Sequence, residues 1–371
     1  MSTWKDTEIT FYLKTEYPII QAGMAGVSTK EMVVAVSEAG GLGTIAGGYL
    51  TTLELEAEIH YVKQHTNKPF SVNLFVLSPT MVFSEQLNQV EKYLAPIKKE
   101  LGIERVDNLV YRDQSLDEKI ELIIALKVPV VSFTFGIPTE DMIDRLRDEG
   151  IIVIGTATSV KEGLLWETAG CHMLVAQGFE AGGHRASFLV EEHHEYPMIG
   201  TFSLLPQITD TVVIPIIAAG GIMDARGVVA AMALGARGVQ MGTAFITTKE
   251  SAASKSYQQA VYASSDDSTI ITSVFSGKPA RTIRNRFTEE LAHVEHNLPP
   301  FPVQHALTKE IRQVASQKED TQWMSLFAGQ NAGIGKMTNA KRLIEKIVDD
   351  IEHFSWHYEF VPHRDDEDED F

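Results

Sequence analysis

The chain has 371 residues, of which 44% are hydrophobic, so it can bury a large core and is too long for one small compact domain. Its net charge of -18 repels phosphate backbones and anionic lipid, which disfavours nucleic acid and membrane surfaces as partners. We see no apolar run of transmembrane length and expect no secretory signal. Cys171 is the single cysteine, so an intrachain disulfide is impossible, a cysteine-based metal site is disfavoured, and a cytoplasmic location is expected.

Short apolar runs rich in β-branched residues recur along the chain and are followed by glycine or other small residues. A strand of a parallel sheet is buried on both faces, which makes it apolar throughout instead of alternating. Helical patterns lie between most runs, and this alternation predicts an α/β fold, specifically a closed (β/α)8 barrel. An open doubly wound sheet alternates in the same way and stays an alternative. The predicted strands are Pro18–Ala22, Leu42–Ala46, Phe70–Val76, Pro129–Phe135, Ile151–Thr156, Met173–Ala176, Ile214–Ala218 and Gly238–Met241.

Several helices have recognisable first and last turns. In a capping box, Ser or Thr caps the first turn and a Glu three residues later bonds back to it. Asp224 can cap a helix running to Leu234, and Gly235 stands where a left-handed residue ends a helix. The predicted capping boxes are Ser28-x-x-Glu31, Thr51-x-x-Glu54 and Ser159-x-x-Glu162.

Two parts are predicted outside the regular barrel. Residues 1–248 form the barrel, with an insertion at about 78–116 that contains a helix around Glu85–Glu100. Residues 249–371 have a different composition and predict a smaller, mostly helical cap. Its helices are expected at Ser251–Ala263, Glu310–Gln317 and Asn339–Phe354. The acidic run Asp365–Asp370 predicts a disordered tail without a function.

The glycine-containing loops that follow the predicted strands are candidate binding sites, because barrel active sites lie at the C-terminal ends of the strands. After the first strand, Gln21-Ala22-Gly23-Met24 would let a planar ligand approach the backbone, although a plain glycine turn is an equal alternative. After the seventh and eighth strands, Gly220-Gly221 and Gly242-Thr243 can bind phosphate through backbone N–H groups and a hydroxyl.

The segment Gln177–His184 follows the sixth strand and contains three glycines, an acid and a histidine. His184 titrates near neutral pH and suits proton abstraction, so we predict that it is catalytic. By contrast, His193 and His194 stand in a polar, Glu-rich loop and are interpreted as surface residues. Asn73, Gln177 and Gln240 are polar residues in apolar strands, and each needs a partner, either a ligand or neighbouring backbone.

Four segments in this order resemble the nitronate monooxygenases, formerly called 2-nitropropane dioxygenases. The resemblance covers about Pro18 to Thr248 and continues at Phe327-Ala-Gly-Gln330. The chain departs from the family pattern at two residues. Gly23 stands where many members have proline, and glycine should loosen the first loop. Phe179 stands where a small residue is common. The four segments are Pro18-Ile-Ile-Gln-Ala-Gly-Met-Ala-Gly26, Gln177-Gly-Phe-Glu-Ala-Gly-Gly-His184, Ala218-Ala-Gly-Gly-Ile222 and Gly238-Val-Gln-Met-Gly-Thr243.

This resemblance implies a barrel that holds FMN non-covalently beneath a helical cap, and a reaction of alkyl nitronates with O2 that gives a carbonyl compound and nitrite. It implies that His184 is the catalytic histidine, acting as a base towards neutral nitroalkanes or as an electrostatic anchor for the nitronate. The predicted cofactor-binding residues are Gln21, Ala22, Gly23, Met24, Asn73, Gln177, Gly182, Gly183, Gly220, Gly221, Gln240, Met241, Gly242, Thr243 and Gln330.

Three other functions remain open from the sequence. An FMN-dependent enoyl-acyl-carrier-protein reductase shares a glycine-glycine-histidine loop and would use NAD(P)H. A flavin-free barrel of the nucleotide dehydrogenase type shares the phosphate loops but needs a nucleophilic cysteine after a strand, whereas Cys171 precedes the sixth strand. A flavin-binding protein without activity is the third. The sequence leaves the oligomeric state and the physiological substrate undetermined.

Overall fold

The computed structural model describes residues 4–77, 80, 84–103, 115–189 and 196–354. Every predicted barrel strand is present, and together they form an 8-stranded parallel sheet in the order β1-β9-β8-β6-β5-β4-β3-β2. A bridge from Ile20 to Leu42 joins the two edge strands and closes the barrel, which excludes the open sheet. The strands are β1 (Ile19–Gln21), β2 (Gly43–Ala46), β3 (Phe70–Phe75), β4 (Val130–Thr134), β5 (Ile152–Ala157), β6 (Met173–Gln177), β8 (Ile216–Ala219) and β9 (Gly238–Met241).

Helices surround this barrel and bury its outer face in a continuous apolar core. The short helix α1 (Glu8–Leu13) closes the N-terminal end, where Ile9 and Leu13 join the apolar residues inside the barrel. Within the described ranges, no helix combines the length and the apolarity needed to cross a membrane. The surrounding helices are α2 (Lys30–Glu38), α3 (Thr52–His65), α5 (Leu116–Ala125), α6 (Glu140–Asp148), α7 (Val160–Thr168), α8 (Thr201–Thr209), α9 (Ala225–Ala233) and α10 (Thr243–Ile246).

The capping predictions are partly correct. Thr51 and Glu54 form a capping box, Asp224 caps α9, and Gly235 has the left-handed φ of 101°. The prediction for α2 is wrong by one residue. Thr29 is the cap, because the hydroxyl of Ser28 accepts a hydrogen bond from the backbone N–H of Met24 instead.

The predicted box of α7 is also incomplete. Ser159 caps the helix through a 3.2 Å bond from the N–H of Glu162. The Glu162 carboxylate does not bond back to Ser159. It accepts from the N–H groups of Thr158 (2.7 Å), Phe188 (2.7 Å) and Leu189 (3.0 Å) instead. This fully buried carboxylate therefore connects α7 to the segment that follows His184.

The barrel interior changes from apolar to polar along its axis. Val175 and Ile217 are paired in register and belong to the lower apolar cluster. Further along the strands the register pairs Gln177 with Ala219 and Ala219 with Gln240. Residues paired in register share a face of the sheet, so Gln177 and Gln240 face the interior. Asn73 of β3 is paired with Ser132 of β4. Polar side chains thus collect near the C-terminal ends of the strands.

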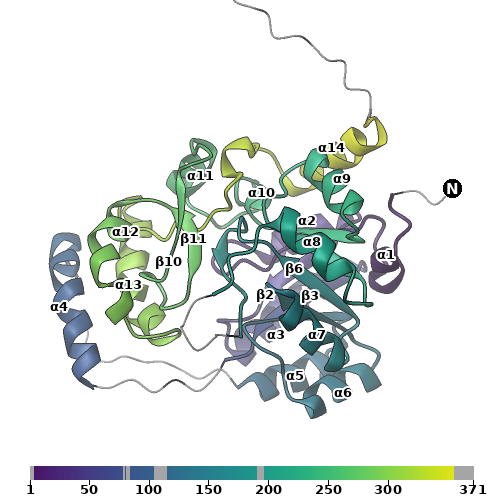
Figure 1. The fold of residues 1–371 in the computed structure, drawn as a ribbon, viewed down its shortest axis with the longest axis horizontal. Coiled ribbons are helices and arrows are strands. Elements are labelled where there is room, and N and C mark those ends of the chain that lie inside the picture. Colours follow the sequence, from purple (N-terminus) through teal and green to yellow (C-terminus); the bar gives the residue numbers. More distant parts are fainter. Residues whose placement is uncertain (1–3, 78–79, 81–83, 104–114, 190–195, 355–371) are drawn as a thin grey trace, which may run out of the picture.

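A smaller unit, which we call the cap, packs beside the barrel and comprises α4, α11, α12, α13, β10 and β11 (Figure 1). Helix α4 comes from the predicted insertion and contacts α13. Strands β10 and β11 were not predicted, and they form an antiparallel sheet with β7, which follows β6 in the barrel part of the chain. The bounds are α4 (Ser84–Leu101), β7 (Gly183–His184), α11 (Lys255–Tyr262), β10 (Thr269–Thr272), β11 (Ala280–Ile283), α12 (Arg286–Leu291) and α13 (Val303–Gln317).

The last helix, α14 (Ala340–Glu352), lies against α2 and α9 of the barrel rather than on the cap. Short 3-10 turns occur at Ala292–Asn297 and Ala332–Ile334.

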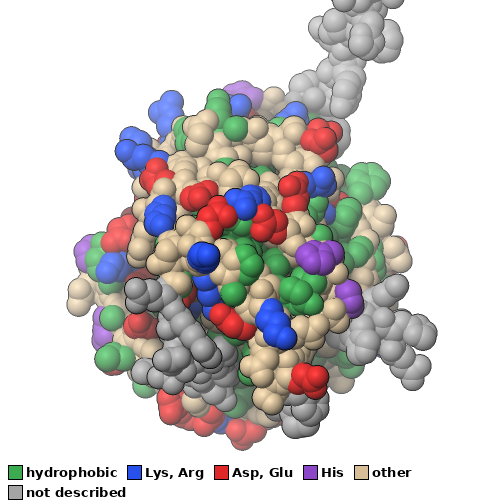
Figure 2. Space-filling model, turned by 90° about the vertical axis from the view of Figure 1, so that its left-hand side faces the viewer, with side chains coloured by type: hydrophobic (Ala, Val, Ile, Leu, Met, Phe, Trp, Pro, Cys, Tyr) green, Lys and Arg blue, Asp and Glu red, His purple; other side chains and the backbone are tan. Residues whose placement is uncertain are grey.

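The division of the chain into a barrel part and a cap part between residues 248 and 249 stays a prediction. The run Asp365–Asp370, together with His193 and His194, lies outside the described residues. On the side of α4, α12 and α13, Figure 2 shows Lys and Arg side chains interspersed with Asp and Glu.

Candidate active site

His184 lies where the barrel meets the cap. It forms β7 with Gly183, and its partner across the sheet is Ala280 of β11. The N–H of Arg185 extends this pairing through a 2.8 Å bond to the carbonyl of Pro279. The sequence predicted a glycine loop here, and the structure shows that the end of this loop is a strand held by the cap.

Aromatic rings surround the imidazole of His184. The ring centroids of Phe135, Phe301 and Phe327 lie 5.7, 5.7 and 5.2 Å from that of His184. Its Nε2 atom lies 2.8 Å from Oγ of Ser276. The residue as a whole is half-buried. Burial, followed by nearby cations, lowers the pKa of His184 to about 3. His184 is therefore neutral at physiological pH in the ligand-free protein.

The cations near His184 are Lys278 and Arg312. The Lys278 ammonium donates to the carbonyl of Ser187 at 2.6 Å and lies 5.0 Å above the ring of Phe135. The Arg312 guanidinium donates to the carbonyl of His305 at 2.9 Å. In the part of the chain that the structure describes, neither cation forms an ion pair with a carboxylate. Their positive charge therefore remains to attract an anion, although the whole chain is acidic.

The loop after β6 is shaped by buried side chains. The Arg185 guanidinium donates to the carbonyls of Gln177 (3.1 Å) and Gly178 (2.7 Å). The Gln177 amide donates to the carbonyl of His184 at 3.1 Å and accepts from the N–H of Ala186 at 2.9 Å. Both ends of this amide bond within the protein, so the Gln177 side chain holds His184 in place. Its predicted contact with FMN stays a prediction, since the amide nitrogen has a second hydrogen to donate.

The C-terminal segment Phe327–Gln330 packs directly on this loop. A Cβ atom at Gly182 would lie 2.5 Å from the backbone nitrogen of Gly329, so only glycine fits. The N–H of Gln330 donates to the carbonyl of Glu180 at 2.9 Å. The Gln330 side chain is half-buried at the same place.

The two predicted phosphate loops lie together because β8 and β9 are neighbouring strands. Gly220 and Gly221 have positive φ angles of 119° and 71°, which glycine adopts without strain. Gly242 precedes the short helix α10, and the Thr243 hydroxyl accepts from the N–H of Gly329 at 2.9 Å. This hydroxyl keeps one hydrogen to donate.

The first loop is tightly bonded. Gln21 is buried, and its amide accepts from the N–H of Thr44 at 2.9 Å and donates to the hydroxyl of Ser28 at 2.8 Å. A Cβ atom at Gly23 would lie 3.0 Å from Cβ of Asn73. The expectation that Gly23 loosens this loop is therefore wrong, because the glycine lets the loop pack closely against β3. The N–H of Ala22 adds a 2.9 Å bond to the carbonyl of Met241.

Two polar side chains of the interior keep atoms for a ligand. The Asn73 amide nitrogen donates to the hydroxyls of Ser132 (3.0 Å) and Thr134 (3.1 Å). Of the two partners considered from the sequence, a ligand or neighbouring protein groups, this nitrogen has the second. The Asn73 oxygen receives no hydrogen bond from the described residues. Gln240 is half-buried, and its side chain forms no hydrogen bond with the described residues. Met241 is buried in the outer core and can meet a cofactor only through its backbone.

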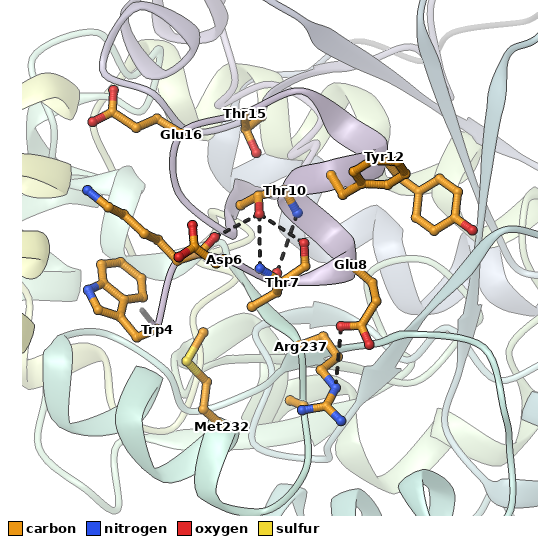
Figure 3. A pocket seen from close by; sticks show the side chains of 13 residues that line it. Trp4, Asp6, Thr7, Glu8, Thr10, Tyr12, Thr15, Glu16, Met232 and Arg237 are labelled. Atoms are coloured by element: carbon orange, nitrogen blue, oxygen red, sulfur yellow. Dashed lines mark hydrogen bonds and ion pairs between the residues drawn. The ribbon is translucent and has the colours of Figure 1, made fainter. Parts of the chain in front are cut away.

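A cavity of about 1120 Å³ lies elsewhere, at the N-terminal end of the barrel (Figure 3). Residues of the segment 4–16 line it, together with Met232, Ala236 and Arg237. An ion pair of 3.5 Å between Glu8 and Arg237 crosses one side. None of the predicted site residues lines this cavity.

Several residues of the site were missed from the sequence. Arg185 directly follows the glycine loop, and a charged residue at that place was a usable signal. Ser276, Lys278 and Arg312 gave no signal, because they reach His184 only through the folding of the cap. Phe301 precedes a proline in an unremarkable segment, and only its contact with His184 shows its place.

Comparisons with known proteins agree with this arrangement. The family model described as nitronate monooxygenase matches residues 7–350. A probable nitronate monooxygenase of Staphylococcus haemolyticus is 46% identical over 94% of this chain and 98% of its own. A solved nitroalkane oxidase from Streptomyces ansochromogenes has a TM-score of 0.86 and 36% identity, covering 93% of this chain and 98% of its own. FabK from Thermotoga maritima has a TM-score of 0.74 and 32% identity, covering 94% and 96%. The chain belongs to the nitronate monooxygenase family.

Proposed function

We propose that the protein is an FMN-dependent monooxygenase that converts alkyl nitronates and O2 into a carbonyl compound and nitrite. The observation that carries the proposal is the position of His184. A neutral histidine stands among aromatic rings and two cations that form no ion pair with a described carboxylate, beside the glycine loops at the C-terminal ends of the barrel strands. A small anionic substrate, O2 and FMN are the partners that we propose.

The residues present fit FMN. Gly220 and Gly221, in their positive-φ conformations, and Gly242 with Thr243 offer backbone N–H groups and one hydroxyl to the phosphate. Inside the barrel, the Asn73 oxygen and the Gln240 amide remain for the polar edge of the ring system or the ribityl chain. Gly23 and Gly182 keep the surrounding backbone close without side chains in the way. Bound FMN would supply the electron acceptor, and the protein supplies position and electrostatics.

The protein groups around His184 have separate roles in this proposal. Lys278 and Arg312 attract the anionic nitronate, and the three phenylalanines exclude water, which strengthens that attraction. Neutral His184 can take a proton from the carbon of a nitroalkane. A bound anion favours the protonated form, so the same residue can hold nitronate oxygens once it carries the proton.

The test begins with the absorption spectrum of the purified protein. We expect a flavin spectrum, oxygen consumption with ethylnitronate or propionate 3-nitronate, and formation of nitrite. A colourless protein that cannot be reconstituted with FMN would refute the proposal. Rapid anaerobic bleaching of the flavin by NADPH would instead support the enoyl-acyl-carrier-protein reductase. Bound FMN without turnover would indicate a binding protein.

We also propose a cytoplasmic location. The single cysteine, Cys171, is a buried free thiol, and burial raises its pKa to about 12. A thiol in this state is unreactive and suits a reducing compartment. Fractionation of cells followed by detection of the protein tests this location.

A further inference from the structure

We propose that Ser276 is a positioning residue that holds His184 in the tautomer with hydrogen on Nε2, so that Nδ1 is the ring nitrogen that takes the proton. This inference rests on the proposed function for its chemical consequence, while the tautomer itself can be observed without turnover. Ser276 is contributed by the cap and His184 by the barrel.

The hydroxyl of Ser276 has one hydrogen and two positions that accept. It donates to the carbonyl of Lys278 at 3.1 Å. It also accepts from the backbone N–H of Lys278 at 3.4 Å. Nε2 of His184 is 2.8 Å away. With its hydrogen engaged by Lys278, Ser276 can only accept from His184. This requires the hydrogen of the neutral imidazole to be on Nε2.

The opposite tautomer would leave one more buried group without a partner. If Ser276 donated to Nε2, the buried carbonyl of Lys278 would lose the donor that the described residues give it. The hydrogen of His184 would then be on Nδ1, which no described residue contacts through a hydrogen bond, in surroundings made of phenylalanine rings. Nδ1 lacks a hydrogen-bond partner among the described residues in either tautomer. The two tautomers therefore differ by the unsatisfied carbonyl of Lys278, which costs about 1–3 kcal/mol and favours hydrogen on Nε2.

The position of Ser276 is fixed by a tight turn. The N–H groups of Ser276 and Gly277 both donate to the carbonyl of Ser273, at 3.1 and 2.7 Å. Gly277 has a φ of 79°, and a Cβ atom there would lie 2.2 Å from the carbonyl oxygen of Pro299. No other residue fits at 277, and the buried hydroxyl of Ser276 is therefore presented to His184 in a defined direction.

The chemical consequence concerns proton abstraction. The C–H bond of a nitroalkane breaks, its electron pair moves into the nitro group to give the nitronate, and the proton forms an N–H bond at Nδ1 of His184. The imidazolium keeps its hydrogen on Nε2, and Ser276 continues to accept that bond. Because an ionic hydrogen bond is stronger than a neutral one, Ser276 also stabilises the protonated product.

The test uses Ser276→Ala, with Ser273→Ala as the matched control in the same turn, because the Ser273 side chain forms no hydrogen bond with His184. Nitrogen NMR of protein labelled in its histidines distinguishes the two tautomers, and His184→Asn identifies the signal. We expect a protonated Nε2 and an unprotonated Nδ1 in the wild type and in the control, and mixed protonation in Ser276→Ala. A wild-type signal with hydrogen on Nδ1, or an unchanged spectrum of Ser276→Ala, would overturn the proposal.

Kinetics of the FMN-loaded protein give the second measurement. Ser276→Ala should lower kcat/KM for a neutral nitroalkane about 10- to 100-fold, because general-base catalysis depends on the correct tautomer. It should lower kcat/KM for a preformed nitronate much less, since no proton is abstracted. Ser276→Thr, which keeps the hydroxyl, should restore the NMR signature. Equal losses with both substrates would contradict the positioning role. If the wild type lacks denitrifying activity while the NMR result holds, only the proposed function fails.

Discussion

Replacement of Gly182 by alanine tests how the C-terminal segment closes the site. The new Cβ atom would lie 2.5 Å from the backbone nitrogen of Gly329 and 2.6 Å from the carbonyl carbon of Ala328. Ordinary contact begins at 3.4 Å, so the segment must move by about 1 Å, which is enough to break the 2.9 Å bonds that Gly329 and Gln330 donate. Overpacking of about 1–3 kcal/mol and two hydrogen bonds of about 1 kcal/mol each predict a loss of about 3–5 kcal/mol in the free energy of unfolding.

The assay is urea unfolding of the FMN-free protein followed by circular dichroism, with FMN titration by fluorescence as the second measurement. We expect Gly182→Ala to unfold at a lower urea concentration and to bind FMN about tenfold more weakly, the equivalent of one lost contact of about 1.4 kcal/mol. The control is Gly227→Ala in α9, where the nearest atoms would be Cγ2 and Cα of Ile222 at 3.2 and 3.3 Å, a much milder approach than at Gly182, and where alanine favours the helix. Identical midpoints and FMN affinities for Gly182→Ala and wild type would refute the packing argument.

Four further predictions concern His184 and Glu162. His184→Asn should keep the flavin spectrum and lower nitrite formation from a neutral nitroalkane at least about 100-fold, because the base is lost. Burial, Lys278 and Arg312 lower the pKa of His184 from 6.5 to about 3. We therefore expect kcat/KM for the neutral nitroalkane not to fall between about pH 8 and about pH 5. A decrease centred near pH 6.5 would contradict the environment assigned to His184. Because the pKa of His184 is lowered in the folded state, neutral His184 contributes its full share to the free energy of unfolding above pH 6.5, and this share is lost as the pH falls towards 3. In acid unfolding, wild type should therefore lose more stability than His184→Asn. Glu162→Gln should destabilise the fold by about 2 kcal/mol, measured by urea unfolding, because an amide nitrogen would face N–H donors that the carboxylate now accepts.

Much of the fold could be predicted from local sequence. The eight barrel strands were located correctly because strands buried on both faces are apolar throughout, and Thr51, Asp224 and Gly235 gave correct helix ends. Strands β10 and β11 were missed because they are short and partly polar, and they are stabilised by pairing with each other and with β7. The α2 cap was misplaced because Ser28 and Thr29 are equivalent as capping residues, and the first loop decides between them.

By itself, the sequence determined the barrel and the positions of the glycine loops, because these depend on periodicity and on residue type at strand ends, and it led to the proposal that His184 is catalytic. Only the tertiary structure decided the state of His184. Ser276 and Lys278 come from the cap, Arg312 and Phe301 lie far along the chain, and together they set its protonation and its hydrogen bond. Long-range contacts of this kind leave no local pattern, because a hydrogen bond or a charge acts through distance in space and not through separation in sequence.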